Sequence, residues 1–365
     1  MKTKILLAAV AGALVMPVPM ASQADVMGGT DFTIYGRVVA GANRTDSDKP
    51  MEDAVWDLGA SGRDGTLDRG SRLGFKASRD VGGMTVGFKL ERQVTNGGLT
   101  NQRHQYVSIG GDFGTITAGN QGSPYLMGAN WAQEWFHGGA TVRTFRQEGL
   151  GYSYNSGPFS LGVLLTGNNG APQNTDRTTV AGRIADDTID DTVIGASYDF
   201  GVVKVGVSYW GNNTENNYDS TALTVSGSVD AFEYYVGYQQ LGDARQIADQ
   251  ACEFDSMGAA EANANGDKGV CGDLDGWGVF LGYNLNDADK IYLEYESQSA
   301  DIASSINAGN EFTNLVVGYS HKFGGSVRFI AEYGKKDVDG MDGRASGAVE
   351  HPDPTSLTLA LLASF

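Results

Sequence analysis

The stretch that decides the fold is TSLTLALLASF, residues 355–365. Apolar Leu357, Leu359 and Leu361 stand at odd-numbered positions, whereas the even-numbered positions are mostly small or polar. Successive side chains of a strand point to opposite faces, so this alternation predicts a strand with one apolar face. A terminal strand left unpaired would be an exposed edge. We therefore expect it to pair with the first strand of the chain and close the sheet, with a soluble sandwich as the alternative.

The same period of two recurs along the chain. In one example, Met84, Val86 and Phe88 alternate with small or charged residues. The alternating segments have about ten residues, which is the length that a tilted strand needs to cross a bilayer. A soluble protein of two packed sheets also alternates, so the length of the segments favours the membrane interpretation without excluding the other.

The connectors between these segments are of two kinds. Short ones, such as 81–83 and 284–287, alternate with long polar ones, such as 95–102 and 242–275. Short turns at one end and long loops at the other are typical of outer-membrane barrels. Counting the segments predicts an all-β, antiparallel transmembrane barrel of about 16 strands, with short periplasmic turns and long extracellular loops.

Composition agrees with a barrel. The chain has 365 residues, 52 of them Gly, and no stretch approaches the ~18 consecutive apolar residues of a spanning helix. Lipid satisfies no backbone hydrogen bond, so a spanning chain without such helices must close into a barrel. The formal charge of −18 argues against a nucleic-acid partner, which would require basic patches.

Residues 1–24 are predicted to be a secretory signal. Lys2 and Lys4 precede a short apolar run, Pro17 interrupts it, and small residues precede a cut at Asp25. Residues 25–365 would then form a single barrel domain. Export by such a signal, together with a membrane-spanning barrel, predicts a location in the outer membrane of a Gram-negative bacterium.

The chain resembles the Gram-negative general porins, particularly the alphaproteobacterial type. The resemblance covers essentially all of residues 25–365 and rests on four features: the opening strand 35–38, the strand 71–75, the segment 119–121 and the terminal Phe365. It implies a homotrimer of 16-stranded barrels, each with a water-filled pore that passes ions and small hydrophilic solutes by passive diffusion without a cofactor. It also implies contact with outer-membrane lipid and lipopolysaccharide, and recognition of Phe365 by the barrel-assembly machinery.

In that family the third long loop folds into the lumen, and it maps onto residues 122–146 here. The loop is rich in aromatic residues, namely Tyr125, Trp131, Trp135 and Phe136. Rings exposed to water on a long loop would be an unusual surface feature. Burial against the barrel wall favours an inward position, and an outward loop that makes trimer or partner contacts is the alternative.

Charged side chains across the pore are expected to set ion selectivity, as charged rings do in channels. Alternation turns one set of wall residues inward: Arg37, Arg72, Lys76, Lys89 and Glu91. The loop adds Glu134, Arg143 and Arg146. The family sets a basic wall against an acidic loop, whereas this loop has Glu134 as its one acid. The transverse field should be weaker, or depend on wall carboxylates such as Glu233, Glu294, Glu296 and Glu332. For any single charge, simple solvation in the lumen is the alternative.

Two loops contain further candidate chemistry. Cys252 and Cys271 lie in the long loop 242–275 and are predicted to form a disulfide, the usual state of a cysteine pair in an exported chain. Asp337, Asp339 and Asp342 have oxygen ligands at a spacing that suits Ca²⁺, although a solvated acidic loop is favoured over a metal site.

Three other functions remain open at this point. A substrate-selective porin, for sugars or anions, would use the loop aromatics as a stacking track. A surface barrel could instead serve as an adhesin or receptor. An enzyme is the remaining rival, but none of the His residues lies near a serine motif and no catalytic residue is predicted.

Overall fold

In the computed structural model, the described residues are 29–46, 55–59, 71–95, 98–129, 146–167, 189, 191–212, 219–242, 271–302, 310–339 and 355–365. Within these ranges no helix is long and apolar enough to cross a membrane. The predicted signal, residues 1–24, lies outside them.

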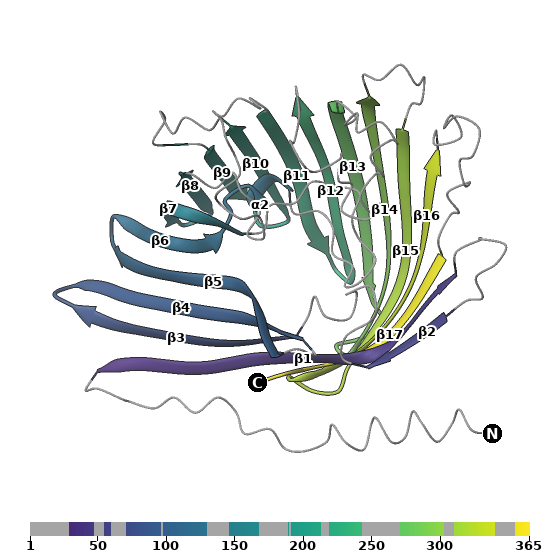
Figure 1. Cartoon of the computed structure of the whole chain (residues 1–365), viewed down its shortest axis with the longest axis horizontal. Coiled ribbons are helices and arrows are strands. Elements are labelled where there is room, and N and C mark those ends of the chain that lie inside the picture. Colours follow the sequence, from purple (N-terminus) through teal and green to yellow (C-terminus); the bar gives the residue numbers. More distant parts are fainter. Residues whose placement is uncertain are drawn as a thin grey trace, which may run out of the picture.

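The described residues form one closed antiparallel ring of 16 strands, as the sequence predicts (Figure 1). Each strand pairs with its neighbours in chain order, and β1 pairs with β17 to complete the ring. The first eight barrel strands are β1 (Thr30–Asp46), β3 (Arg72–Val81), β4 (Met84–Thr95), β5 (Gly98–Gly111), β6 (Gly114–Gly122), β7 (Arg146–Ser156), β8 (Phe159–Thr166) and β9 (Asp191–Asp199). The other eight are β10 (Val203–Asn212), β11 (Asp219–Val229), β12 (Phe232–Gly242), β13 (Cys271–Asn284), β14 (Asp289–Ile302), β15 (Asn310–Lys322), β16 (Val327–Asp339) and β17 (Thr355–Ser364).

The terminal stretch closes the barrel. β17 pairs with β1 over ten residue pairs, from Arg37 opposite Ser364 to Asp46 opposite Thr355. The final residue continues the ladder: the Phe365 N–H donates to the Gly36 carbonyl at 3.1 Å, and the Gly36 N–H donates to the Phe365 carbonyl at 3.0 Å. The predicted pairing of the last strand with the first is therefore confirmed.

β1 is longer than its neighbour β3, and a seventeenth strand fills the difference. β3 pairs with the first part of β1, from Thr30 to Arg37. The short strand β2 (Val55–Gly59) pairs with β1 beyond that point, between Gly41 and Thr45. β2 supplements the wall and is not a member of the 16-stranded ring.

The two faces of the wall differ as the alternation predicts. Large apolar side chains such as Phe88, Val107 and Leu293 are 42%, 59% and 42% exposed on the outer surface. Inward positions on the same strands hold polar or small residues, and Glu91 is one of them. An exposed apolar exterior around a polar interior is the reverse of a soluble sandwich, whose apolar side chains are covered.

The tight turns gather at one end of the barrel. β3 and β4 are joined by Gly82 and Gly83, whose φ angles of +59° and +84° suit a two-residue hairpin. β11 and β12 are joined through Asp230, which has a φ of +52°. Phe365 lies at this same end, because it pairs with β1 near that strand's beginning.

At the opposite end, strands extend further than the sequence predicts. Most of the predicted loop 95–102 belongs to strands, because β4 continues to Thr95 and β5 begins at Gly98. Beyond the apolar band, a strand need not alternate apolar with polar residues, because water or loops contact both of its faces there. Strand pairing therefore continues where the hydrophobic signal stops.

Because strands extend beyond their predicted ends, residues of two candidate loop sites lie on strands. β13 begins at Cys271, so this cysteine belongs to a strand and not to the interior of a loop. Asp337 and Asp339 lie within β16, opposite Thr313 and Glu311. Their partners in the predictions, Cys252 and Asp342, are outside the described residues, so the disulfide and the Ca²⁺ site stay predictions.

Candidate functional site

Five described basic side chains gather on the inner face of β1, β3, β4 and β5; we call this set the basic wall. Its members are Arg37, Arg72, Lys76, Lys89 and Arg103. Arg37 stands directly opposite Arg72 in the β1–β3 register, and Lys76 stands directly opposite Lys89 in the β3–β4 register. Like charges directly opposite each other destabilise a sheet. The stability of the sheet therefore does not explain this arrangement.

Glu91 lies in the middle of the basic wall and is 2% exposed. Arg103 Nε donates to its Oε1 at 2.6 Å, and the Tyr35 hydroxyl donates to its Oε2 at 2.9 Å. Arg72 Nε and Lys89 Nζ approach the same Oε2 only at 4.0 and 3.9 Å, which is too far for a hydrogen bond. Charge-assisted hydrogen bonds are the stronger kind, so Glu91 is chiefly the partner of Arg103.

A β-bulge turns Arg103 inward. Glu91 pairs with His104, but the next residue, Arg92, pairs with Gln102, so Arg103 is an extra residue on β5. Strict alternation would point Arg103 outward, because His104 and Tyr106 hold the inward positions. A bulge re-aims one side chain locally. It is the reason that Arg103 reaches Glu91.

Tyr35 reaches Glu91 across an intervening strand. Tyr35 on β1 stands opposite Gly74 on β3, and Gly74 stands opposite Glu91 on β4. The Tyr35 ring lies over Gly74, where an added Cβ would collide with it. The glycine is therefore required for the hydrogen bond between strands that are not neighbours.

A second cross-strand row of Tyr, Gly and Glu, like that of Tyr35, Gly74 and Glu91, lies on the other side of β17. Tyr292 on β14, Gly318 on β15 and Glu332 on β16 follow one another in register. The Tyr292 ring covers Gly318, and its hydroxyl donates to Glu332. Two Tyr–Gly–Glu rows thus brace the inner wall by the same means.

The beginning of the third loop packs against the inner wall. The helical turn α2 (Leu126–Ala129) contacts β9, β10, β11 and β12, and it lies inside the ring of strands in Figure 1. Tyr125 is fully buried, packs edge-on against Trp210 with ring centroids 6.1 Å apart, and hydrogen-bonds Ser220. Burial raises the pKa of Tyr125 to about 12, so its hydroxyl stays protonated at neutral pH.

Small residues on the inner wall make room for this segment. Gly162, Gly195, Ser208 and Ala222 form one cross-strand row on β8–β11. A Cβ added at Gly195 would collide with the Pro124 carbonyl, and one added at Gly206 would collide with the Met127 carbonyl. The Thr224 hydroxyl, opposite Gly206, donates to the Gly128 carbonyl. The wall is therefore shaped to hold residues 124–128.

The wall carboxylates named from the sequence lie on β12, β14 and β16. Glu294, Glu296 and Glu332 are fully buried. Glu233 forms an ion pair with Lys290 and accepts a hydrogen bond from Asn284 at 2.9 Å. β17 separates this group from β1, so these four carboxylates lie in a different sector of the lumen wall from the basic wall.

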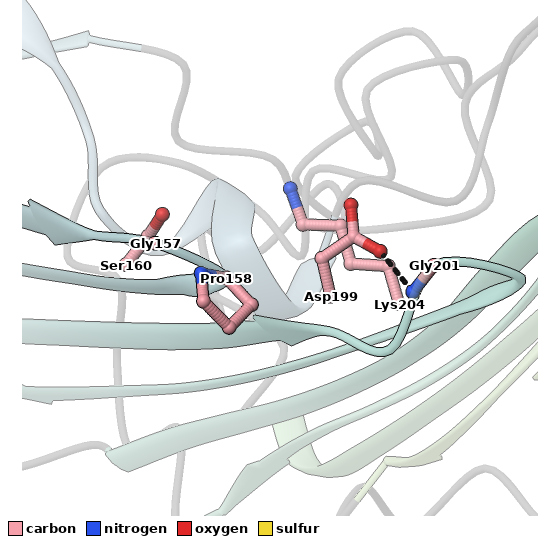
Figure 2. A pocket seen from close by; sticks show the side chains of 6 residues that line it. All are labelled: Gly157, Pro158, Ser160, Asp199, Gly201 and Lys204. Atoms are coloured by element: carbon pink, nitrogen blue, oxygen red, sulfur yellow. Dashed lines mark hydrogen bonds between the residues drawn. The ribbon is translucent and has the colours of Figure 1, made fainter.

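A separate cavity of about 460 Å³ lies at the short-turn end (Figure 2). Its lining includes Ser160, Asp199 and Lys204, and the Gly201 N–H donates to Asp199 Oδ1 at 2.7 Å. One acid and one base leave the cavity without a net charge. It shares no residue with the basic wall.

The structure brings together all five wall residues predicted from the sequence: Arg37, Arg72, Lys76, Lys89 and Glu91. Of the predicted loop residues, Tyr125 packs against the inner wall. Others lie outside the described residues: Glu134, Arg143, Trp131, Trp135 and Phe136. For Arg146 only the backbone, the first residue of β7, is described. Among the described residues, no group of three or more His, Cys, Asp or Glu side chains is placed to hold a metal.

Sequence reasoning missed Arg103, the two Tyr–Gly–Glu rows and the wall glycines. Arg103 falls on the outward parity, so only knowledge of the bulge would have placed it in the lumen. The Tyr–Gly–Glu rows depend on strand register, which alternation within single segments does not give. A concentration of glycine at inward positions of neighbouring segments was the signal that could have predicted where the wall makes room for residues 124–128.

Comparisons with known proteins agree on one family. A sequence model described as Gram-negative porin matches residues 7–341. Major outer membrane protein P.IB of Neisseria lactamica is 31% identical over 128 residues, which are 34% of this chain and 35% of that protein. The aligned region thus spans about a third of the length of that relative.

Solved structures with the same fold cover nearly all of this chain. OmpF of Salmonella typhi, solved in complex with daunomycin, matches with a TM-score of 0.67 at 13% identity, over 95% of this chain and 100% of that one. OmpT of Vibrio cholerae, an outer membrane protein solved in a trimer form, matches with a TM-score of 0.63 at 16% identity, over 92% and 100%. At such low identities these likenesses establish the fold alone.

Proposed function

The chain belongs to the Gram-negative porin family, and from this premise we propose that it forms a water-filled channel through the outer membrane. Ions and small hydrophilic solutes would cross it by passive diffusion. No covalent step or energy source is involved, so the protein acts as a channel and not as an enzyme.

One observation carries this proposal: a closed barrel with an apolar exterior has a charged interior. Phe88 on β4 is 42% exposed outward, whereas the next residue, Lys89, points to the inner face beside Glu91. Charged side chains line a lumen stably only if water fills it, because burying unpaired charge in a dry interior is costly. The same strand therefore faces lipid on one side and water on the other.

We propose that residues 122–146 narrow the lumen. The support is the packing of residues 124–128 against β8–β11, which commits the start of the loop to the interior. The basic wall would then form one side of the constriction. Glu134, Arg143 and Arg146, together with the loop aromatics, would contribute from the loop.

We propose a homotrimer as the assembled form. The support is the family, together with the trimer form in which a protein of the same fold has been solved. Lipopolysaccharide contact and recognition of Phe365 by the barrel-assembly machinery remain proposals of the same kind.

Single-channel recording tests the function directly. Purified protein is added to a planar lipid bilayer in KCl, with detergent alone as the control. We expect stepwise current increments, each resolving into three equal levels if three pores insert together. Absence of current at any protein concentration would contradict the channel and favour an adhesin or receptor, and block by one uncharged sugar alone would favour a sugar-selective porin.

A further inference from the structure

We propose that the cavity at the short-turn end is a binding site for a small zwitterion, such as a free α-amino acid. Lys204 would hold the carboxylate of the ligand, and Asp199 would hold its ammonium group. The binding follows from the cavity alone, whereas a part for it in the passage of solutes rests on the proposed channel function.

The cavity lies on the inner face of the wall, next to the beginning of the third loop. Lys204 is two residues before Gly206, where an added Cβ would collide with the Met127 carbonyl. Ser160 is likewise two residues before Gly162, another inward position that the loop covers. Side chains two residues apart on a strand share a face. Both lining residues therefore occupy the next inward positions toward the short turns, where a solute that has passed the loop leaves the barrel.

Two opposite charges in the cavity stand opposite each other without forming an ion pair. Lys204 faces Asp199 directly in the β9–β10 register, and both side chains are exposed. Figure 2 shows their charged groups projecting to the same side of the strands. Lys204 nevertheless has no hydrogen bond or ion pair with any residue in the described part of the chain. Its ammonium group is therefore available to an anionic group of a ligand.

The turn between β9 and β10 explains why Asp199 does not close onto Lys204. The Gly201 N–H donates to Asp199 Oδ1 at 2.7 Å, which directs the carboxylate toward the turn. The Asp199 N–H donates in turn to the Pro158 carbonyl at 3.0 Å and so joins this turn to the one between β7 and β8. The other carboxylate oxygen, Oδ2, keeps its capacity to accept hydrogen bonds from a ligand.

The combination of groups selects the class of ligand. A carboxylate alone would be attracted by Lys204 and repelled by Asp199, and an amine alone would meet the reverse. A molecule with both charges a few bonds apart can engage both residues, and the Ser160 hydroxyl can donate to it or accept from it. The volume of about 460 Å³ lies within the range of about 300–1,000 Å³ that is usual for small-ligand pockets. A free amino acid meets all of these requirements.

The test is ligand binding to the full-length protein in detergent micelles, measured by saturation-transfer NMR. L-Alanine is the probe, because its carboxyl and amino groups are both charged at pH 7. Propionate and ethylamine are the comparison ligands, since each keeps one of the two charges. We expect alanine to bind saturably. The comparison ligands should bind more weakly by about tenfold or more, because each lacks one charged hydrogen bond.

Two variants, K204Q and D199N, each remove one charge from the cavity. The new Asn side chain keeps an oxygen for the Gly201 N–H, so D199N preserves the turn. Each variant should weaken alanine binding by about tenfold or more. In addition, D199N should abolish the preference for alanine over propionate, and K204Q the preference for alanine over ethylamine. If D199N does not fold, K204Q and its ethylamine comparison decide the question.

Lys322→Gln and Asp230→Asn are the matched controls. Both residues lie at the short-turn end, Lys322 as the last residue of β15 and Asp230 in the turn between β11 and β12. Neither is among the described residues that line the cavity. Each control removes the same charge as one of the test variants and should leave alanine binding unchanged.

Three results would overturn the proposal: no saturable binding of alanine, equal binding of propionate or ethylamine, or undiminished binding in K204Q and D199N. The KCl current of the same preparation in a planar bilayer tests the channel separately. Normal current without alanine binding would overturn the zwitterion site and leave the channel intact. Alanine binding without current would support the site and overturn the channel.

Discussion

The Tyr35 hydroxyl donates a 2.9 Å hydrogen bond to Glu91 although their strands, β1 and β4, are separated by β3. The ring crosses β3 at Gly74, which has no side chain to obstruct it. Backbone ladders join only adjacent strands, so this contact couples the seam of the barrel to the basic wall. The row Tyr292, Gly318 and Glu332 repeats the device, which makes it a general brace of this inner wall.

Replacing Gly74 by Ala should destabilise the barrel. The new methyl group would occupy the place of the Tyr35 ring and push it away from Glu91. Overpacking of this kind costs about 1–3 kcal/mol. The measurement is urea-induced unfolding in lipid vesicles, followed by tryptophan fluorescence.

Gly325 provides the matched control for that substitution. It lies in the turn between β15 and β16, and a Cβ added there meets nothing within 4 Å. The variant Gly325→Ala should therefore unfold as the parent does. Equal unfolding midpoints for Gly74→Ala and Gly325→Ala would contradict the proposed role of the Tyr35 ring.

Replacing Glu91 by Gln should make the channel more selective for anions. The substitution keeps the shape of the side chain and removes the one described carboxylate of the basic wall. The reversal potential in asymmetric KCl should shift toward that of chloride. Loss of the charged hydrogen bonds from Arg103 and Tyr35 should also lower stability, by about 1.5–3 kcal/mol.

Glu148 on β7 controls for the loss of one negative charge. It shares the parity of Leu150, which is 54% exposed on the exterior, so its charge lies outside the lumen. Glu148→Gln should not move the reversal potential. A shift of the same size in both variants would mean that overall charge, and not the basic wall, sets the selectivity.

The sequence predicted the barrel because its signals are local. Alternation at Met84, Val86 and Phe88 is visible within a few residues, and the apolar exterior requires it wherever lipid contacts the wall. The parts of a strand that lie beyond the lipid are under no such requirement. This is why β4 and β5 extend past the predicted boundary at 95–102. The period of the pattern therefore identifies the strands but not their full lengths.

The site was predicted only as far as alternation holds. Arg37, Arg72, Lys76, Lys89 and Glu91 share the inward face because no irregularity separates them along their strands. Arg103 was missed because the bulge beside Glu91 shifts its parity by one residue. The bracing glycines were missed because their role depends on what stands opposite them in the closed barrel.

Replacing Gly206 by Ala should loosen the third loop and widen the channel. The added methyl group would collide with the Met127 carbonyl and displace α2 from the inner wall. We expect a higher or noisier single-channel conductance, with little loss of barrel stability. Gly122→Ala is the control, since a Cβ added there meets nothing within 4 Å. Unchanged conductance in Gly206→Ala would show that residues 124–128 do not hold the loop that limits the current.

Two changes at Phe365 can distinguish a structural role of this residue from a role in assembly. The Phe365 ring lies over Gly36, while its backbone makes two hydrogen bonds to the same residue at 3.0 and 3.1 Å. Phe365→Ala removes only the ring of a residue that is 36% exposed, and should cost about 1–2 kcal/mol. Deleting Phe365 also removes both hydrogen bonds, for a further loss of about 1–3 kcal/mol.

Refolding of purified protein into vesicles measures these effects without any cellular factor. If Phe365→Ala refolds well in vesicles but is depleted from the outer membrane of cells, the ring is read during assembly. Equal loss in both settings would instead mean that the ring matters through its packing on Gly36.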